Sequence, residues 1–116
     1  MAAENWFGVK LLFVSEIPGD AERDRLCEES IIVVQAHDED HARQDAERLA
    51  LNMQHSYPND RGELVEWRFV RILEVQELAE DHIKVGTEVW SRLFYESQAT
   101  DPEIVGSLNG AAASHR

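Results

Sequence analysis

The stretch HSYPNDRGELVEWRFVRILEVQEL, residues 55–78, decides the fold of this chain. It contains the sequence Pro-Asn-Asp-Arg-Gly at residues 58–62, and these residue types preset or tolerate the backbone angles of tight turns. After the turn, apolar side chains alternate with polar ones at period two: Val65, Trp67, Phe69, Leu73 and Val75 against Glu66, Arg68, Glu74 and Gln76. This alternation is typical of a β-strand, so it predicts one long strand and a sheet at the core of the fold.

Four further segments of the sequence, before and after this strand, also show a clear pattern. Residues 6–17 form an apolar strand whose two faces are both hydrophobic, which predicts a central place in the sheet, and residues 31–34 form a β-branched second strand. A charged loop over residues 18–29 separates these two strands. Residues 87–95 alternate again and predict a last strand.

A helix is expected between the second strand and the turn. Asp38 is a good N-cap, and the helix should end near Gln54. Its apolar stripe consists of Ala42, Ala46, Leu49, Ala50 and Met53. The sequence therefore predicts an α+β fold: a twisted, mostly antiparallel sheet of about four strands in the order β-β-α-β-β, with one main helix packed on one face.

The length allows one globular domain. At 116 residues the chain has no room for two independent cores, so we expect a domain over residues 1–96 and a flexible, Ser-, Gly- and Ala-rich tail over residues 97–116. The single cysteine, Cys27, excludes an internal disulfide and is compatible with a reducing compartment. The sequence contains no recognisable targeting or membrane-spanning segment, which predicts a cytoplasmic protein.

The charge is strongly negative. The chain has 23 acidic and 11 basic residues, for a formal net charge of −12. Nucleic acids and anionic membranes need a positive surface to displace their counterions, so we expect neither as a partner. A basic protein is the partner that such a charge attracts, although the charge can also serve solubility alone.

Apolar residues occur on both faces of the predicted sheet. One helix covers only one face, which leaves a second apolar face that needs a cover. The available covers are strong curling of the sheet, the tail with Ile104 and Val105, the segment 18–29, or a second copy of the chain. We expect a homodimer formed through the sheet face.

Polar residues at the junction between helix and sheet define a candidate cleft. His55, Ser56 and Tyr57 lie beside the turn, and Trp67 follows on the long strand. A Ser near a His and a Glu can be drawn as a hydrolase site, but no Gly-x-Ser-x-Gly turn is present. The same residues are explained by a polar cluster in which His55 or Ser56 bonds free carbonyls at the helix end and Tyr57 packs on the sheet.

Other polar residues are better explained without catalysis. Arg68, Glu88 and Arg92 are expected to form a ladder of ion pairs on the sheet surface. His37, His41 and Asp45 are spaced four apart, as metal ligands on a helix would be, but His37 precedes the N-cap and should not share that face.

Cys27 could act as a nucleophile with His55 or His82 as its base, but Glu28 and Glu29 beside it oppose thiolate formation. We therefore expect no metal, no cofactor and no catalytic residue.

Three separated blocks resemble a known family. They are residues 6–13, WFGVKLLF; a spaced set between His55 and Leu78; and residues 86–92, GTEVWSR. Together they are similar to the uncharacterised bacterial proteins catalogued as domain of unknown function 4288. The resemblance implies no activity and no site residues, because that family has no assigned function.

Two functions remain open. The first is a non-enzymatic protein-interaction module, in one version an immunity or antitoxin-type protein that neutralises a basic toxin. The alternative is a small enzyme or ligand-binding protein with its cleft near His55, Tyr57 and Trp67.

Overall fold

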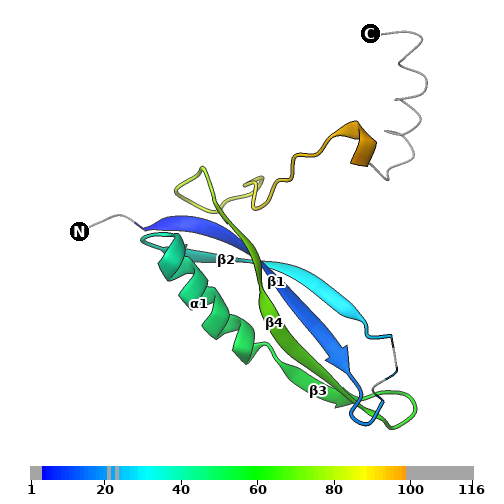
Figure 1. Cartoon of the computed structure of the whole chain (residues 1–116). Coiled ribbons are helices and arrows are strands. Elements are labelled where there is room, and N and C mark those ends of the chain that lie inside the picture. The colour runs from blue at the N-terminus through cyan, green and yellow to red at the C-terminus, as the bar shows by residue number, and fades with distance from the viewer. Residues whose placement is uncertain (1–3, 21, 23, 99–116) are drawn as a thin grey trace, which may run out of the picture.

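The computed structural model describes residues 4–20, residue 22 and residues 24–98. Its sheet has four antiparallel strands in the spatial order β2-β1-β4-β3. Their bounds are β1 Asn5–Glu16, β2 Cys27–Ala36, β3 His55–Pro58 and β4 Leu64–Glu77. The helix α1, Glu39–Asn52, lies against one face of this sheet (Figure 1). The predicted α+β class and the order strand, strand, helix, strand, strand are confirmed.

The central strand is β1, as its two apolar faces predict. It pairs with β2 on one side and with β4 on the other. On the helix side Phe7, Val9, Leu11 and Phe13 are almost fully buried, and they meet the small side chains of Ala42, Ala46 and Ala50 on α1. Alanines allow the helix to approach the sheet closely, and each buried Val, Leu or Phe contributes about 1.5–3 kcal/mol relative to an exposed one.

The helix begins where the sequence predicts. The Asp38 side chain accepts a hydrogen bond of 2.8 Å from the His41 backbone N–H. The helix ends with Met53 as its C-cap, one residue before the expected end. Its apolar stripe is narrower than predicted, because Leu49 and Met53 are largely exposed.

The second strand is longer than predicted. Residues 27–30 continue β2 because they pair with the far end of β1, and Lys10 forms an ion pair of 3.2 Å with Glu29 across this ladder. The expected loop therefore shortens to the residues before Cys27, and the Ser15 N–H donates to the Leu26 carbonyl at its end.

Two parts of the predicted strand set are wrong. Residues 55–58, expected as a junction and turn, form β3 and pair with residues 64–67 of β4. Residues 87–95, expected as the last strand, have no strand structure. An extended segment can lie across the face of a sheet as well as along its edge, and period-two alternation does not distinguish these arrangements.

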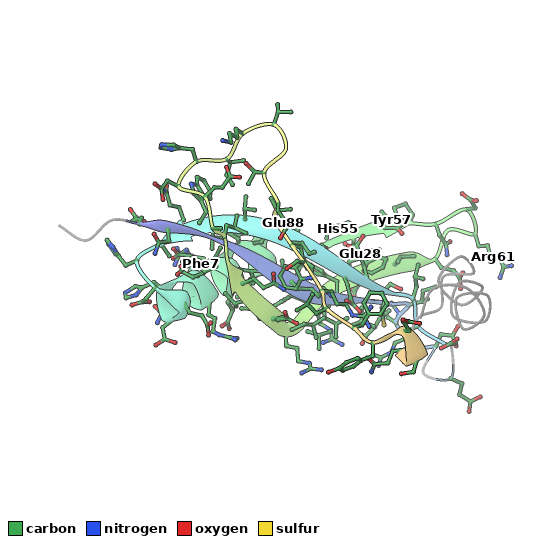
Figure 2. The ribbon with its side chains drawn as sticks, turned by 90° about the horizontal axis from the view of Figure 1, so that it is seen from above. Phe7, Glu28, His55, Tyr57, Arg61 and Glu88 are labelled. Atoms are coloured by element: carbon green, nitrogen blue, oxygen red, sulfur yellow. The ribbon has the colours of Figure 1, made fainter. Side chains whose placement is uncertain are left out.

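The segment after β4 crosses the face of the sheet opposite the helix. It leaves the end of β4 and forms a loop (Figure 1), and in the view from above it runs across the ribbons of the sheet (Figure 2). Gly8 of β1 lies under the Val89 carbonyl and the Trp90 ring. We call residues 87–92 the strap. The strap covers part of the second apolar face, the one opposite the helix. This segment was not among the covers that the sequence suggested.

The tail predicted over residues 97–116 is described only at residues 97 and 98, which belong to a short 3₁₀ helix, Glu96–Gln98. Ile104 and Val105 lie outside the described residues.

Candidate functional site

The candidate cleft residues lie where β3 pairs with β4. His55 is opposite Trp67 in the ladder, and Tyr57 is opposite Val65. The Trp67 indole N–H donates to the Tyr57 hydroxyl oxygen at 3.4 Å, and the His55 and Tyr57 rings stack with their centroids 6.0 Å apart. The three rings therefore form one aromatic cluster on this edge of the sheet.

His55 also serves the end of the helix. Its Nδ1 lies 3.1 Å from the carbonyl oxygen of Met53, the C-cap of α1. A carbonyl only accepts hydrogen bonds, so this contact is a hydrogen bond in the tautomer whose proton is on Nδ1. This contact corresponds to one version of the expected polar cluster, in which His55 bonds a carbonyl at the helix end.

A cavity of about 230 Å³ lies beside the aromatic cluster. It is lined by Ser15, Ile17, Asp24, Leu26, Tyr57, Asn59, Val65 and Trp67. His55 and Ser56 are not among these side chains, so the structure does not bring the predicted His–Ser pair into this cavity. The lining combines aromatic and aliphatic surface with a few polar groups, as ligand pockets do, but the volume is smaller than the range of about 300–1,000 Å³ that is usual for drug-sized ligands.

Arg68 has a different partner from the expected one. Its guanidinium bonds the Glu16 carboxylate, and Arg25 reaches the same carboxylate at 2.7 Å. The hydrogen bond from Arg68 is the main cause that holds the pKa of Glu16 below its ordinary value. The predicted ladder of Arg68, Glu88 and Arg92 is wrong, because Glu88 and Arg92 lie on the segment that crosses the sheet and Arg68 faces β1.

The strap is fixed by side chains from the two central strands. The Gln76 side-chain amide donates to the Ser91 carbonyl at 2.8 Å and accepts from the Ser91 N–H at 3.3 Å. The Lys10 ammonium lies 5.2 Å from the Trp90 ring centroid, within the range of a cation–π interaction. Arg92 packs over the Phe94 ring at 5.0 Å. Figure 2 shows Glu88 on this segment, whereas His55 and Tyr57 lie on β3.

An acidic pocket forms where the strap meets the end of β4. It has a volume of about 150 Å³ and is lined by Gln76, Glu77, Leu78, Ala79, Glu80, Glu88, Trp90 and Ser91. Three of the lining residues are glutamates, and among the lining residues none is basic. Two lysines in the described part of the chain contact lining residues: Lys84 lies 3.4 Å from the Glu80 carboxylate, and Lys10 lies 5.2 Å from the Trp90 ring centroid. A pocket with acidic and aromatic lining is suited to a cationic side chain.

Sequence reasoning missed this pocket, although Glu88 was among its candidates. The signal that could have found it is Gly8 within an otherwise apolar strand, because glycine in a strand often marks the close approach of another backbone.

Residues 6–91 match the family described as Domain of unknown function (DUF4288). The chain belongs to this family. The match confirms the resemblance carried by the three sequence blocks. No curated protein and no solved structure matches the chain.

The DUF4288 match contains the whole sheet except Asn5, the first residue of β1, together with the helix and the strap up to Ser91. It therefore includes Gly8, Gln76 and Trp90, the residues that hold the strap on the sheet. Both the aromatic cavity and the acidic pocket lie within the DUF4288 region.

The remaining candidates have local roles in this DUF4288 domain. The His41 ring bonds the Asp38 carboxylate at 2.7 Å, which raises the pKa of His41. The hydrogen bond from the His41 backbone N–H, and after it the bond to the His41 ring, lowers the pKa of Asp38. Within the described part of the chain, no group of three or more His, Cys, Asp or Glu residues is arranged to hold a metal ion. Cys27 is exposed on β2, at the opposite edge of the sheet from His55 on β3.

None of the helices in residues 4–20, 22 and 24–98 has the length and apolar character needed to cross a membrane.

Proposed function

We propose that this protein is a non-enzymatic interaction module that binds a basic protein, and that the acidic pocket receives an Arg or Lys side chain of that partner. The observation that supports this proposal is the joint lining of the pocket by glutamates and Trp90. A guanidinium or ammonium group gains both from nearby carboxylates and from the face of an indole ring.

The surface charge supports the same proposal. None of the described polar or charged residues is buried, so the negative charge of the described part lies at the surface. Such a field accelerates the approach of a positively charged protein and is screened by salt. An immunity or antitoxin-type protein that neutralises a basic toxin in the cytoplasm is one concrete form of this function.

The test is a pull-down from native cells with three forms of the whole chain as bait, followed by mass spectrometry. One bait is the wild type, one carries Glu80→Gln and Glu88→Gln in the pocket, and one carries Glu47→Gln and Asp60→Asn elsewhere. The two variants lose the same charge, so they separate the pocket from the general field. We expect a basic protein that the wild type and the control retain and the pocket variant loses.

Salt provides the second arm of this test. Capture that depends on charge should weaken steeply when the salt concentration rises from about 0.05 to about 0.5 M. Equal capture by the two variants, or capture that salt does not change, would contradict the proposal.

Ligand binding is the second candidate, and the cavity beside Tyr57 and Trp67 favours it. A thermal-shift screen with small aromatic compounds tests it. A genuine ligand should stabilise the wild type and lose its effect in Tyr57→Ala, since Tyr57 lines the cavity but is substantially exposed. Shifts of equal size in the two proteins would argue against this site.

A further inference from the structure

The outer edge of β2 is the feature that neither the family nor the proposed function explains. β2 is the last strand on its side of the sheet, and ten residues, Cys27–Ala36, form it. An edge strand presents a row of backbone donors and acceptors that can pair with another strand. The direction in which each backbone N–H and C=O group of β2 points follows from the pairing of β2 with β1.

The odd-numbered residues of β2 point their backbone groups outward. The Ser15 N–H donates to the Leu26 carbonyl, in register with the ladder, so Leu26 faces β1. Hydrogen-bonded and non-hydrogen-bonded pairs alternate along an antiparallel ladder. Residues 28, 30, 32 and 34 therefore bond to β1, and the N–H and C=O groups of residues 29, 31, 33 and 35 face away from the sheet.

The other side of the sheet is protected against such pairing. β3 has only four residues and ends with Pro58. Within the described residues, the part of β4 that extends past β3 has no neighbouring strand on that side. The ladder between β4 and β1 contains two register shifts, and bulges of this kind twist a strand so that another strand pairs with it less readily. The ladder between β1 and β2 runs without a shift.

The outer side chains of β2 are also suited to pairing. Residues 31–36, IIVVQA, contain no charge, no proline and no glycine. Ile31 is 39% exposed and Val33 is 37% exposed, and both have a high preference for strands. Natural proteins rarely leave a regular apolar edge of this kind open, because it promotes aggregation.

We propose that β2 pairs antiparallel with β2 of a second copy of this chain, with Ile32 on the two-fold axis. This register places Ile31 opposite Val33 of the second copy and satisfies the outward backbone groups of both strands. The two sheets then join into one continuous sheet. The proposal concerns an edge that is separate from the acidic pocket, so it does not rest on the proposed function.

Charge selects this register. Glu28 and Glu29 lie at the start of β2. With Ile32 on the axis, Glu28 is opposite Ala36 and Glu29 is opposite Gln35 of the second copy, so no acidic side chain is opposite another. A shift of the axis towards residue 30 would bring the Glu29 side chains of the two copies together, and like charges on neighbouring strands are destabilising.

The test uses the full chain at several concentrations in analytical ultracentrifugation. We expect a reversible dimer for the wild type. Val33→Glu places a charge beside Glu29 and beside the same substituted position 33 of the second copy, and it should weaken dimerisation by about a factor of ten or more. Val70→Glu is the matched control, because Val70 is 42% exposed but lies on β4. It should dimerise like the wild type.

Amide hydrogen exchange measured by NMR reports on the edge itself. The amides of residues 29, 31, 33 and 35 should become protected as concentration rises, whereas those of residues 28, 30, 32 and 34 should be protected throughout. A protein that stays monomeric at all concentrations would overturn the proposal. The same holds if the outward amides of that monomer are protected by another segment of its own chain. Equal weakening by the Glu substitutions at positions 33 and 70 would also overturn it.

Discussion

Gly8 lies in the central strand because the Val89 carbonyl occupies the space where a larger side chain would begin. A Cβ atom at this position would come closer to that oxygen than real Cβ atoms come to their neighbours. The obstructing atom belongs to the backbone, so it cannot rotate away. At the residue scale, the attachment of the strap therefore depends on the absence of one methyl group.

Gly8→Ala should release or displace the strap and destabilise the fold by about 1–3 kcal/mol, as overpacking does elsewhere. The fluorescence of Trp90 should shift to longer wavelength, and limited proteolysis should cut residues 78–95 faster. Gly19→Ala is the control: it strains a residue with φ of 89° but meets no atom within 4 Å. An unchanged protease pattern in Gly8→Ala would contradict this role.

The pair of Asp38 and His41 makes stability depend on pH. The pKa of Asp38 is lowered, so its contribution is fully present above its ordinary value of 3.8 and is lost as pH falls through the folded value. The pKa of His41 is raised, so its contribution is fully present below its ordinary value of 6.5 and is lost as pH rises through the folded value.

The pair should therefore stabilise the helix most between about pH 4 and pH 6.5. Melting curves followed by circular dichroism, recorded for wild type and His41→Gln, measure this effect. The two melting temperatures should differ most in that window and converge at alkaline pH. A difference that grows at alkaline pH would show that the charged imidazole is not responsible.

At the scale of elements, the sequence predicts those helices and strands whose position depends on the chemistry of their own residues. The cap at Asp38 fixes the helix start, and the two apolar faces of residues 6–17 identify the central strand. The sequence fails for residues 55–58 and 87–95, because their roles depend on distant partners. β3 exists because β4 lies beside it, and the strap lies on the sheet because Gly8 and Gln76 hold it there. The acidic pocket could not be predicted for the same reason.

The contact between helix and sheet can be tested at Ala46, which is fully buried. Ala46→Leu should destabilise the protein by about 1–3 kcal/mol, because the added atoms must separate α1 from the sheet. Glu47→Leu, at the neighbouring exposed position, should have an effect within about 0.5 kcal/mol. Urea unfolding of both variants gives the comparison, and equal effects would show that the helix does not pack through its alanines.

At the scale of the whole molecule, repulsion among acidic groups opposes folding. The net charge is −12, and the ion pairs in the described part of the chain are at least partly exposed. Exposed ion pairs contribute only about 0–1 kcal/mol each to stability. Added salt screens both this attraction and the repulsion among the acidic groups, and because the repulsion is the larger of the two, salt should stabilise the fold.

The melting temperature should therefore rise when the ionic strength increases from about 0.01 to about 0.15 M, where the Debye length is about 8 Å. Differential scanning calorimetry measures this change, with an equal osmolarity of sucrose as the control for non-ionic effects. A fall in the melting temperature would mean that the ion pairs outweigh the repulsion.

The position of β1 between β2 and β4 also has a consequence for synthesis on the ribosome. β1 emerges before the other strands of this sheet, but its partner on one side is β4, which emerges only after β2, α1 and β3. During that interval a hydrophobic strand has one partner and one open edge. Pairing over such a separation along the chain closes a large loop and is therefore slow. We therefore expect the nascent chain to depend most on a chaperone in the period between the appearance of α1 and the completion of residue 77.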